Sequence, residues 1–495
     1  MGIQFKKLYF DNFRIRFSRR FIGLFSQNYL ECFAIISVLL IMSKMFWNNY
    51  HPLIMNDGDS ILYYTYAQNI LNCPINLTVG RMMDAVSENC LPTIQGKEFT
   101  FYNDHPAGLS LLVAGVIKIG FESLQQIRVL FFIISLLIGL MAYQITKAYR
   151  GKTFARLVLV AILITPLYLF HSVVVHMFSI TSLLSTILTL FFVKYIESRN
   201  KKNIKYLLFI SFLGFIVDWP IFLLSLIFVV ITFIKREYRI GLLILIYTII
   251  SYCIIRIWLN FDQANFNEGG FTEIGGLLNN VPKLNELIDF FYYFLKAHFI
   301  VSLGFLILVL HFLKNRQHLF SDSFTLFTFI LFVQGTLNIF LFLGWASSHI
   351  YWSHLLIVPT SIGLAFGLNY LKTELKNSQF NVTIASIIFA SIFYSYSWWI
   401  KDYQTRPITI SEYLKNDNLE ILLNPGVDLI SNDPMILFGQ AAKLRLSINR
   451  QFCESEELCK SKKKYNIYKF NPNTSSSMNK AVYLDWFGWY IYETH

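Results

Sequence analysis

Acidic and imidazole side chains that could do chemistry occur in one segment near the start of the chain. Asp57 and Asp59 stand close together, and Asp104-His105-Pro106 follows further along. A carboxylate can serve as a general base, and a His beside an Asp can steer a phosphate or bind a metal ion. Simpler interpretations stay open, because either early aspartate can cap the helix that follows it and a His-Pro pair is often structural.

Four further charged residues stand beside or inside apolar runs. Arg256 lies within one, where a charge is costly and therefore a functional candidate, unless the side chain snorkels to the interface. Asp218-Trp219-Pro220 separates two runs that are short for a bilayer, so Asp218 either faces a wet cavity or caps the second run. Lys97 and Lys296 could hold an anion, although basic residues are common at interfaces.

The composition shows what kind of scaffold must position these residues. Of 495 residues, 55% are hydrophobic and only 15% are charged, whereas soluble domains carry about 25% charged residues. The net charge of +12 is spread over short clusters between apolar runs, which is typical of positive-inside topology. Because the chain lacks a basic and aromatic binding module, nucleic acid is not an expected partner.

The sequence predicts an all-α polytopic membrane protein with about eleven spans, since an apolar helix of about 20 residues crosses a bilayer. The predicted spans are Leu30–Trp47, Val129–Ile145, Phe154–Phe170, Val173–Val193, Tyr206–Val217, Ile221–Ile234, Ile240–Leu259, Ala297–Leu313, Phe324–Leu343, Ile350–Leu371 and Val382–Ile400. The shorter run Ala107–Phe121 is predicted not to cross.

The basic clusters fix the predicted orientation, because all of them can lie on the cytoplasmic side only with this set of spans. They are Lys6–Arg20, Lys147–Arg156, Lys194–Lys205, Lys235–Arg239, Lys314–Arg316 and Lys372–Lys376. The predicted organisation is then a cytoplasmic basic N-terminus (1–29), a transmembrane domain (30–400) with large outer loops at 48–128 and 260–296, and an outer C-terminal domain (401–495).

The C-terminal domain is predicted to be a small α/β unit, with strand character at Val427–Ile430, Tyr465–Phe470 and Ala481–Tyr492. Four cysteines fall in segments placed outside, namely Cys73, Cys90, Cys453 and Cys459. By proximity they would pair as 73–90 and 453–459 in an oxidising compartment. They can equally be four unremarkable thiols, because connectivity does not follow from sequence.

The segment after Asp59 has apolar or aromatic residues at helical spacing, at Leu62, Tyr63, Tyr66, Ile70 and Leu71. This pattern predicts an amphipathic helix on the outer membrane surface.

Over about 60 residues the first loop resembles the multispanning glycosyltransferases of the GT-C type, including protein O-mannosyltransferases and lipid A aminoarabinose transferases. In that family an acid, a tyrosine and an amphipathic helix precede a Gly-aromatic stretch and a Pro-containing motif. The matching positions here are Asp59, Tyr63, Ile70-Leu71, Gly96, Phe101 and His105-Pro106. The chain departs from the pattern at Ser60, where many members have Glu, and at Ala107, where many have a second Pro.

The resemblance implies a membrane glycosyltransferase that moves a sugar from a polyprenyl-phosphate (or dolichyl-phosphate) donor to an outer lipid, glycan or protein acceptor. Asp59 would be the base of an inverting single displacement. The substrate-binding candidates are Asp57, Tyr63, Lys97, His105, Asp218, Arg256 and Lys296. A divalent metal is possible at Asp59 and His105, although the two departures weaken that site.

Two other functions stay open from the sequence. One is a transporter or flippase, which would show repeats and mid-membrane charges; no repeat stands out. The other is a polymerase-like transferase acting on two lipid-linked glycans, which would use outer-loop arginines. The bias toward Ile, Lys, Asn and Phe suggests an AT-rich bacterial genome, and hence an inner-membrane location.

Overall fold

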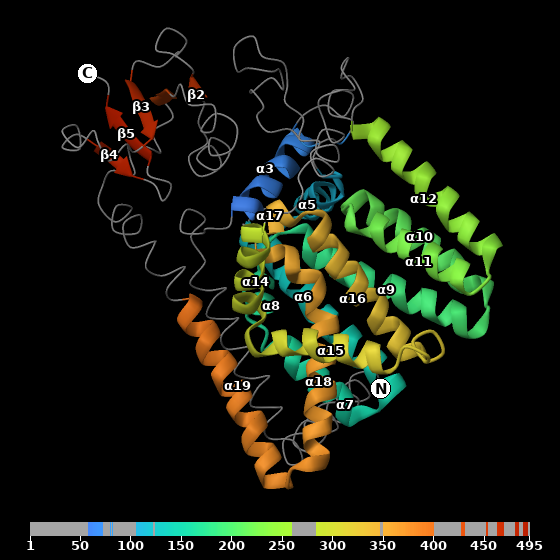
Figure 1. Ribbon diagram of the computed structural model, residues 1–495. Helices are drawn as coiled ribbons and strands as arrows, with labels where there is room; N and C mark the ends of the chain where they lie inside the picture. Colours follow the sequence, from blue (N-terminus) through green and yellow to red (C-terminus); the bar gives the residue numbers. More distant parts are fainter. Residues whose placement is uncertain are drawn as a thin grey trace, which may run out of the picture.

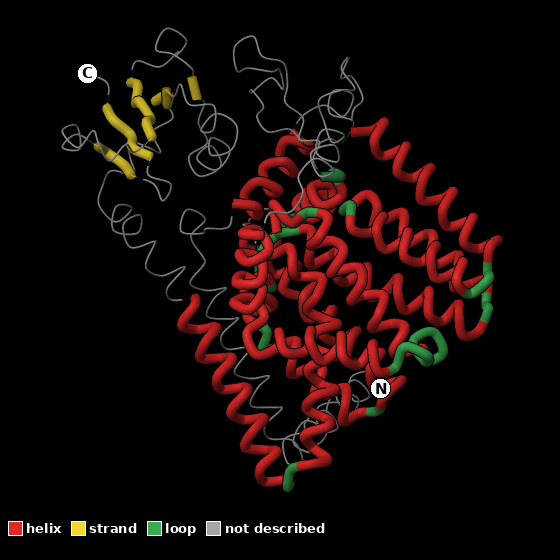
Figure 2. Tube along the Cα trace, in the orientation of Figure 1, coloured by secondary structure: helices red, strands yellow, loops and turns green. Residues whose placement is uncertain are grey.

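The structure is a computed structural model, and it describes residues 58–72, 80, 82, 105–121, 124–259, 284–346 and 350–399, together with five short strands between 427 and 493. Figure 2 shows these residues as a bundle of helices with a group of strands. The predicted first span, Leu30–Trp47, and the loop candidates Asp57 and Lys97 lie outside the described residues.

The described helices follow the predicted apolar runs closely (Figure 1). Their bounds are α3 Gly58–Asn72, α5 Gly108–Lys118, α6 Leu124–Arg150, α7 Lys152–Leu163, α8 Pro166–His171, α9 Met177–Ser198, α10 Lys201–Val217, α11 Pro220–Ile234, α12 Tyr238–Leu259, α14 Leu284–His298, η2 Phe299–Ser302, α15 Leu303–Lys314, α16 Ser323–Leu341, α17 Leu343–Ala346, η3 Ile350–Leu356, α18 Ile357–Glu374 and α19 Asn377–Trp399.

The chain is an integral, multi-pass membrane protein, as predicted. Among the described residues, seven helical segments are long and apolar enough to cross a membrane. The exact number of eleven spans stays a prediction. The run predicted not to cross forms α5, whose 11 residues rise only about 16 Å, about half the thickness of a bilayer core.

Three predicted spans are interrupted, and one of them, Ile350–Leu371, begins with the 3-10 turn η3 before α18. Phe154–Phe170 divides into α7 and α8 at Thr165-Pro166, because proline has no N–H to continue the helix and instead begins the next one. Thr165 at the break donates its hydroxyl to the carbonyl of Ala161, at 2.8 Å. Ala297–Leu313 begins with the 3-10 turn η2, where Phe299 has a positive φ of 47°, and α14 and α15 run in different directions there (Figure 1).

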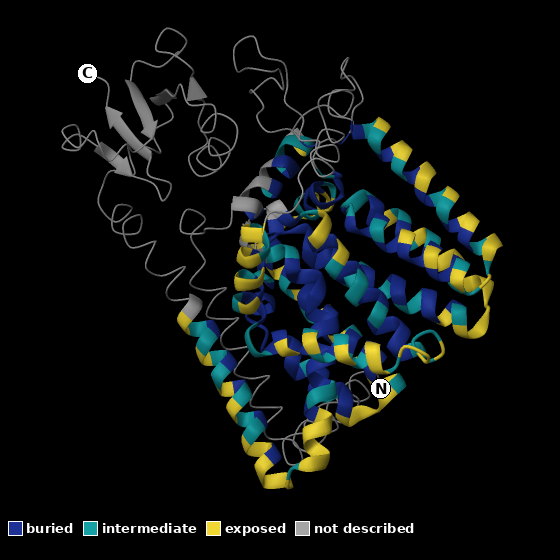
Figure 3. Cartoon of the chain, in the orientation of Figure 1, coloured by how far each residue is buried: buried dark blue, intermediate teal, exposed yellow. Residues whose placement is uncertain are grey.

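Burial separates the centre of the bundle from its lipid-facing surface. Most residues of α9, α16 and α18 are buried, whereas α12 and α19 bury little. Figure 3 shows exposed residues along α12 and α19, and many of these are large and apolar, such as Ile246, Ile250, Phe389 and Phe393. In a bilayer, lipid chains cover such residues, so their exposure here fits a spanning bundle.

One end of the bundle is tied together by polar contacts between segments distant in sequence. Arg150 pairs with Asp322, and Arg199 lies 2.9 Å from Glu237. The ammonium of Lys235 donates to the Phe320 carbonyl at 2.5 Å. These contacts join the basic clusters at Lys147–Arg156, Lys194–Lys205 and Lys235–Arg239 to the loop after Lys314–Arg316. The clusters therefore share one end of the bundle, as the topology requires, and we call this the inner end.

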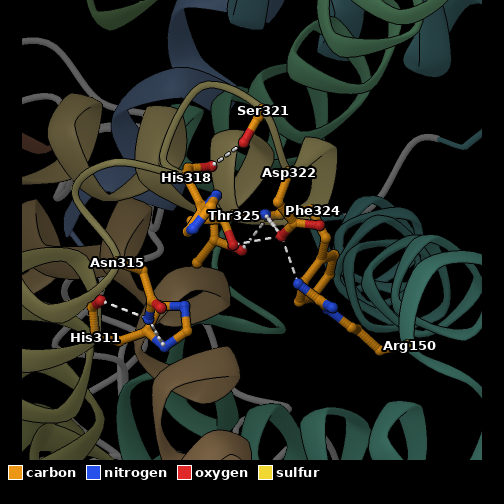
Figure 4. Close-up of polar contacts among 9 residues, drawn as sticks. Arg150, His311, Asn315, His318, Ser321, Asp322, Phe324 and Thr325 are labelled. Carbon is orange, nitrogen blue, oxygen red and sulfur yellow. Dashed lines mark hydrogen bonds and ion pairs between the residues drawn. The ribbon is translucent and has the colours of Figure 1, made fainter.

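Figure 4 shows the centre of the inner-end network. The carboxylate of Asp322 accepts the backbone N–H of Thr325 at 2.9 Å, and so caps the start of α16. The same carboxylate meets the Arg150 guanidinium, which lies 5.3 Å from the centre of the Phe324 ring. One aspartate thus fixes the end of α6 against the beginning of α16.

The five strands form one sheet in the order β2-β1-β3-β5-β4. Their bounds are β1 Val427–Ile430, β2 Phe452–Cys453, β3 Lys463–Lys469, β4 Ala481–Leu484 and β5 Trp489–Glu493. β1 pairs in parallel with β2 and β3, while β5 pairs antiparallel with β3 and β4. β1 has the predicted bounds, β3 begins two residues earlier and ends one residue earlier than predicted, and the predicted Ala481–Tyr492 is two strands. The short strand β2 was not predicted. The outer location of 401–495 stays a prediction.

Candidate active site

Helix α3 places Asp59 in its first turn. The predicted helix is present as α3, and Tyr63, Tyr66 and Ala67 form its buried face, whereas Leu71, predicted to share that face, is exposed. The buried face packs against α5, the helix that begins just after His105. The side chain of Asp59 lies outside the described ones, so the structure fixes which elements surround this position and leaves the orientation of the carboxylate open.

The junction between α8 and α9 contacts the same turn of α3. The backbone N–H of Val175 donates to the hydroxyl of Ser60 at 2.7 Å. One turn further along α3, the Tyr63 ring meets the His176 ring edge to face, with centroids 6.1 Å apart. The His176 imidazole also caps α9, because its Nδ1 accepts the N–H of Phe178 at 3.2 Å. Ser60, which follows Asp59, and Tyr63 are thus both held by the connection between α8 and α9.

His105 and Asp218, both named from the sequence as substrate-binding candidates, come together. The Nδ1 atom of His105 lies 3.5 Å from Oδ1 of Asp218, and their side chains are 19% and 1% exposed. This is an ion-pair distance and is longer than a usual hydrogen bond. The carboxylate therefore stands close enough to one imidazole nitrogen to hold the ring at this position.

The Asp218 carboxylate is fixed from two other directions. Its Oδ2 accepts the Thr181 hydroxyl at 2.9 Å, and its Oδ1 accepts the N–H of Trp219 at 2.9 Å. The simpler interpretation, in which Asp218 caps the second run, does not hold: Trp219 is the N-cap residue of α11, and this helix has no side-chain cap. The Asp218 carboxylate faces His105 instead. A buried carboxylate needs such partners, because an isolated one would be strongly destabilised.

Gly108 allows this approach. A β-carbon added there would lie 2.5 Å from the carbonyl oxygen of Ile216, far inside normal contact. Because Ile216 stands at the end of α10 directly before the turn with Asp218, the close backbone approach at Gly108 sets how near His105 comes to the carboxylate. Close helix approach is a regular use of glycine.

We expect Gly108→Ala to lower activity at this site, because α5 must move away from α10 to make room for the methyl group. Gly115→Ala in the same helix is the matched control, since nothing lies within 4 Å of a β-carbon there. Overpacking of this kind typically costs about 1–3 kcal/mol of stability. Thermal unfolding in detergent should show a loss only for Gly108→Ala, and equal melting temperatures for the two variants would contradict the expected clash.

Two arginines lie at the same end of the bundle. The Arg256 guanidinium lies 5.9 Å from the centre of the Trp219 ring, next to Asp218, so Arg256 faces the predicted site region. Arg128 in α6 is 2% exposed, and its neighbours Ile127 and Phe131 belong to the cluster that buries Tyr63 and Tyr66. Sequence reasoning missed Arg128, although an arginine at the start of an apolar run is a visible signal.

Lys296 lies in the last turn of α14, which packs mainly against η2, η3, α8 and α17. These elements are other than α10 and α11, between which Asp218 lies. Asp57 and Lys97 lie outside the described residues, as do Cys73, Cys90 and Cys459; Cys453 stands in β2.

Histidines that the sequence scatters meet near this site. The ring of His176 lies 4.6 Å from that of Tyr351 and 6.4 Å from His171, which in turn lies 6.2 Å from His354. His354 is buried and shares a 2.9 Å hydrogen bond with Ser182. From sequence, the aromatics near Tyr351 are expected in the interfacial belt; the 3-10 turn η3 instead directs His354 inward.

Among the described residues, no group of three or more His, Cys, Asp or Glu side chains could hold a metal ion. The predicted metal ligands were Asp59 and His105, and the side chain of Asp59 lies outside the described residues. The metal site therefore stays a prediction.

The arrangement of α3, α5 and the long helices is shared with solved structures of ArnT from Cupriavidus metallidurans. ArnT bound to undecaprenyl phosphate superposes with a TM-score of 0.60 at 10% identity, over 94% of this chain and 98% of that one. The fold is that of a GT-C glycosyltransferase. The apo state of the same ArnT gives a TM-score of 0.54 at 10% identity, with 96% and 98% covered.

A more distant GT-C structure is the oligosaccharyltransferase of Archaeoglobus fulgidus, in complex with Zn and sulfate. Its TM-score is 0.50 at 15% identity, and the match covers 86% of this chain and 62% of that one. No protein-family model matches the sequence, and no curated protein matches it either. The GT-C fold thus extends a resemblance first seen in one loop to nearly the whole chain.

Proposed function

We propose that this protein transfers a sugar from a polyprenyl-phosphate donor to an acceptor on the outer side of the membrane. The observation that carries the proposal is the shared fold with an ArnT whose structure holds undecaprenyl phosphate, over 94% of this chain. The sequence motif supports it independently, because Asp59, Tyr63 and His105-Pro106 match the family at the elements that build the outer end of the bundle.

The proposed reaction is a single displacement. A hydroxyl or amine of the acceptor attacks the anomeric carbon of the sugar, the bond from that carbon to the phosphate oxygen breaks, and polyprenyl phosphate leaves. Asp59 takes the proton of the attacking group, which is the role of a general base. Attack opposite the leaving group inverts the anomeric configuration.

The leaving phosphate needs positive charge near it. Arg256 at Trp219 and Arg128 beside the Tyr63 cluster are the cations that the described outer end offers next to the proposed site. His105, held beside Asp218, is a further donor to a phosphate when its ring is protonated. Asp57, Lys97 and Lys296 remain substrate-binding candidates on the strength of their positions in the sequence, and a divalent metal remains possible.

The donor and acceptor are proposed as classes only: a lipid-linked sugar, and a lipid, glycan or protein that reaches the outer surface. The location proposed is the bacterial inner membrane, with the N-terminus in the cytoplasm and the C-terminus in the periplasm. The shared inner end of the basic clusters supports this orientation, because such clusters concentrate on the cytoplasmic side.

The proposal predicts that activity depends on the lipid carrier. Purified protein in proteoliposomes, given membrane extract as acceptor, should transfer radiolabelled sugar from polyprenyl-phosphate donors and fail to use the corresponding nucleotide sugars. Transfer from nucleotide sugars alone would contradict the proposal. Movement of the lipid-linked sugar across the vesicle membrane without any acceptor would favour the transporter alternative.

A further inference from the structure

Ser60 is the one departure from the family pattern that stands directly beside the proposed base. Its side chain is completely buried, at 0% exposure, although serine is a polar residue. Its hydroxyl accepts the backbone N–H of Val175 at 2.7 Å. The bond crosses between segments far apart in the sequence, from the first turn of α3 to the connection between α8 and α9.

The donor in this bond needs an acceptor. Val175 is itself buried, and it lies between the end of α8 at His171 and the start of α9 at Met177. Its N–H therefore has no place in a regular helix ladder, and a buried N–H left without an acceptor is strongly unfavourable. The bond to Ser60 is consequently one that the fold is expected to keep.

The same connection contacts α3 a second time. One turn after Asp59, Tyr63 meets His176 edge to face, and its hydroxyl lies 3.9 Å from the sulfur of Met177. Residues 59 and 63 are four apart and share a face of the helix. Ser60 and Tyr63 together therefore fix the rotation of the first turn about its axis, and with it the place of the Asp59 backbone.

We infer that Ser60 is a positioning residue, which holds Asp59 in register through the backbone of the α8–α9 connection. This inference rests on the proposed function, in which Asp59 is the base. Where related enzymes carry a second acid, this chain uses a neutral hydroxyl to anchor the helix. The site then has one carboxylate fewer than in those enzymes. The Ser60 hydroxyl acts through Asp59 and does not touch the substrate.

The test is kinetic. Ser60→Ala removes the acceptor, and we expect kcat to fall by about 10- to 100-fold, because small misplacements of a reacting group have effects of this size. The KM for the lipid donor should change little, since Ser60 holds no part of the lipid. Ser60→Thr, which keeps the hydroxyl, should recover most of the lost kcat.

Ser110→Ala is the matched control. Ser110 is also fully buried, in the neighbouring helix α5, and its hydroxyl has no hydrogen-bond partner among the described residues, so this variant should keep the wild-type kcat. Should Ser60→Ala fail to fold, Ser60→Cys takes its place, because a thiol of similar size is a poorer acceptor and should give an intermediate kcat.

Two failures can be told apart. A wild-type kcat in Ser60→Ala, or in Ser60→Cys where the alanine variant does not fold, overturns the inference when Asp59→Asn is inactive in the same assay. An active Asp59→Asn variant instead overturns the catalytic role of Asp59 in the proposed function. Equal losses of kcat in Ser60→Ala and Ser60→Thr would also count against the inference, because a hydroxyl at this position would then make no difference.

Discussion

Asp59→Asn is expected to lower kcat for sugar transfer by about 10²- to 10⁴-fold, the range that general-base catalysis contributes. The amide has nearly the shape of the carboxylate but cannot take a proton from the acceptor. Donor binding should be retained, because the phosphate is held by cations elsewhere. The measurement is single-turnover transfer in proteoliposomes, with donor binding followed separately.

The control for this variant is Asp289→Asn, which makes the same change at an exposed aspartate of α14. Full activity is expected there. If Asp59→Asn is folded, binds the donor and still transfers sugar at the wild-type rate, Asp59 is not the base, and the proton must go to another group.

Asp218→Asn is expected to lower kcat/KM by about 10-fold, or about 1.4 kcal/mol, because the ion pair between its carboxylate and His105 is lost. The amide can still accept the N–H of Trp219 or the Thr181 hydroxyl, but the negative charge beside His105 is lost. The fold should therefore survive, while the imidazole loses the group that orders it.

A double-mutant cycle identifies the partner. If Asp218 acts through His105, adding Asp218→Asn to His105→Ala should reduce kcat/KM little further, because coupled residues are not additive. Asp289→Asn, at the exposed aspartate of α14, is again the control and should leave transfer unchanged. Fully additive losses would show that the two residues act separately.

The sequence predicted the parts of the fold that depend on local patterns. The lengths of the apolar runs predicted the helices. The turn Asp218-Trp219-Pro220 correctly divided α10 from α11, because a proline can begin a helix without losing a hydrogen bond. The breaks at Thr165-Pro166 and at Phe299 were harder to predict. The first carries a proline inside an apolar run, whereas the second depends on how α14 packs against η3 and carries no comparable signal.

For the candidate site, the sequence identified residues that share a segment and could not identify partners from other segments. His105 and Asp218 were both named as substrate-binding candidates, so their meeting at one site followed from the resemblance and not from a pattern that links the two segments. The Ser60–Val175 bond and the approach of His171 to His354 were not predicted, because they join positions from separate helices. Arg128 could have been found from the sequence, because it is an arginine at the start of an apolar run. The inward direction of His354, by contrast, depends on the 3-10 turn η3.

The inner end of the bundle is held by three polar contacts. They join Arg150 to Asp322, Arg199 to Glu237, and Lys235 to the Phe320 carbonyl. Helices pinned at one end can still lean. A lean of about 5° over a 30 Å membrane core moves the free end by nearly 3 Å, which is about the separation that reacting atoms must reach. A small tilt of the helices about the inner end would therefore be enough to bring the groups around Asp59 together or to separate them, without any large domain movement.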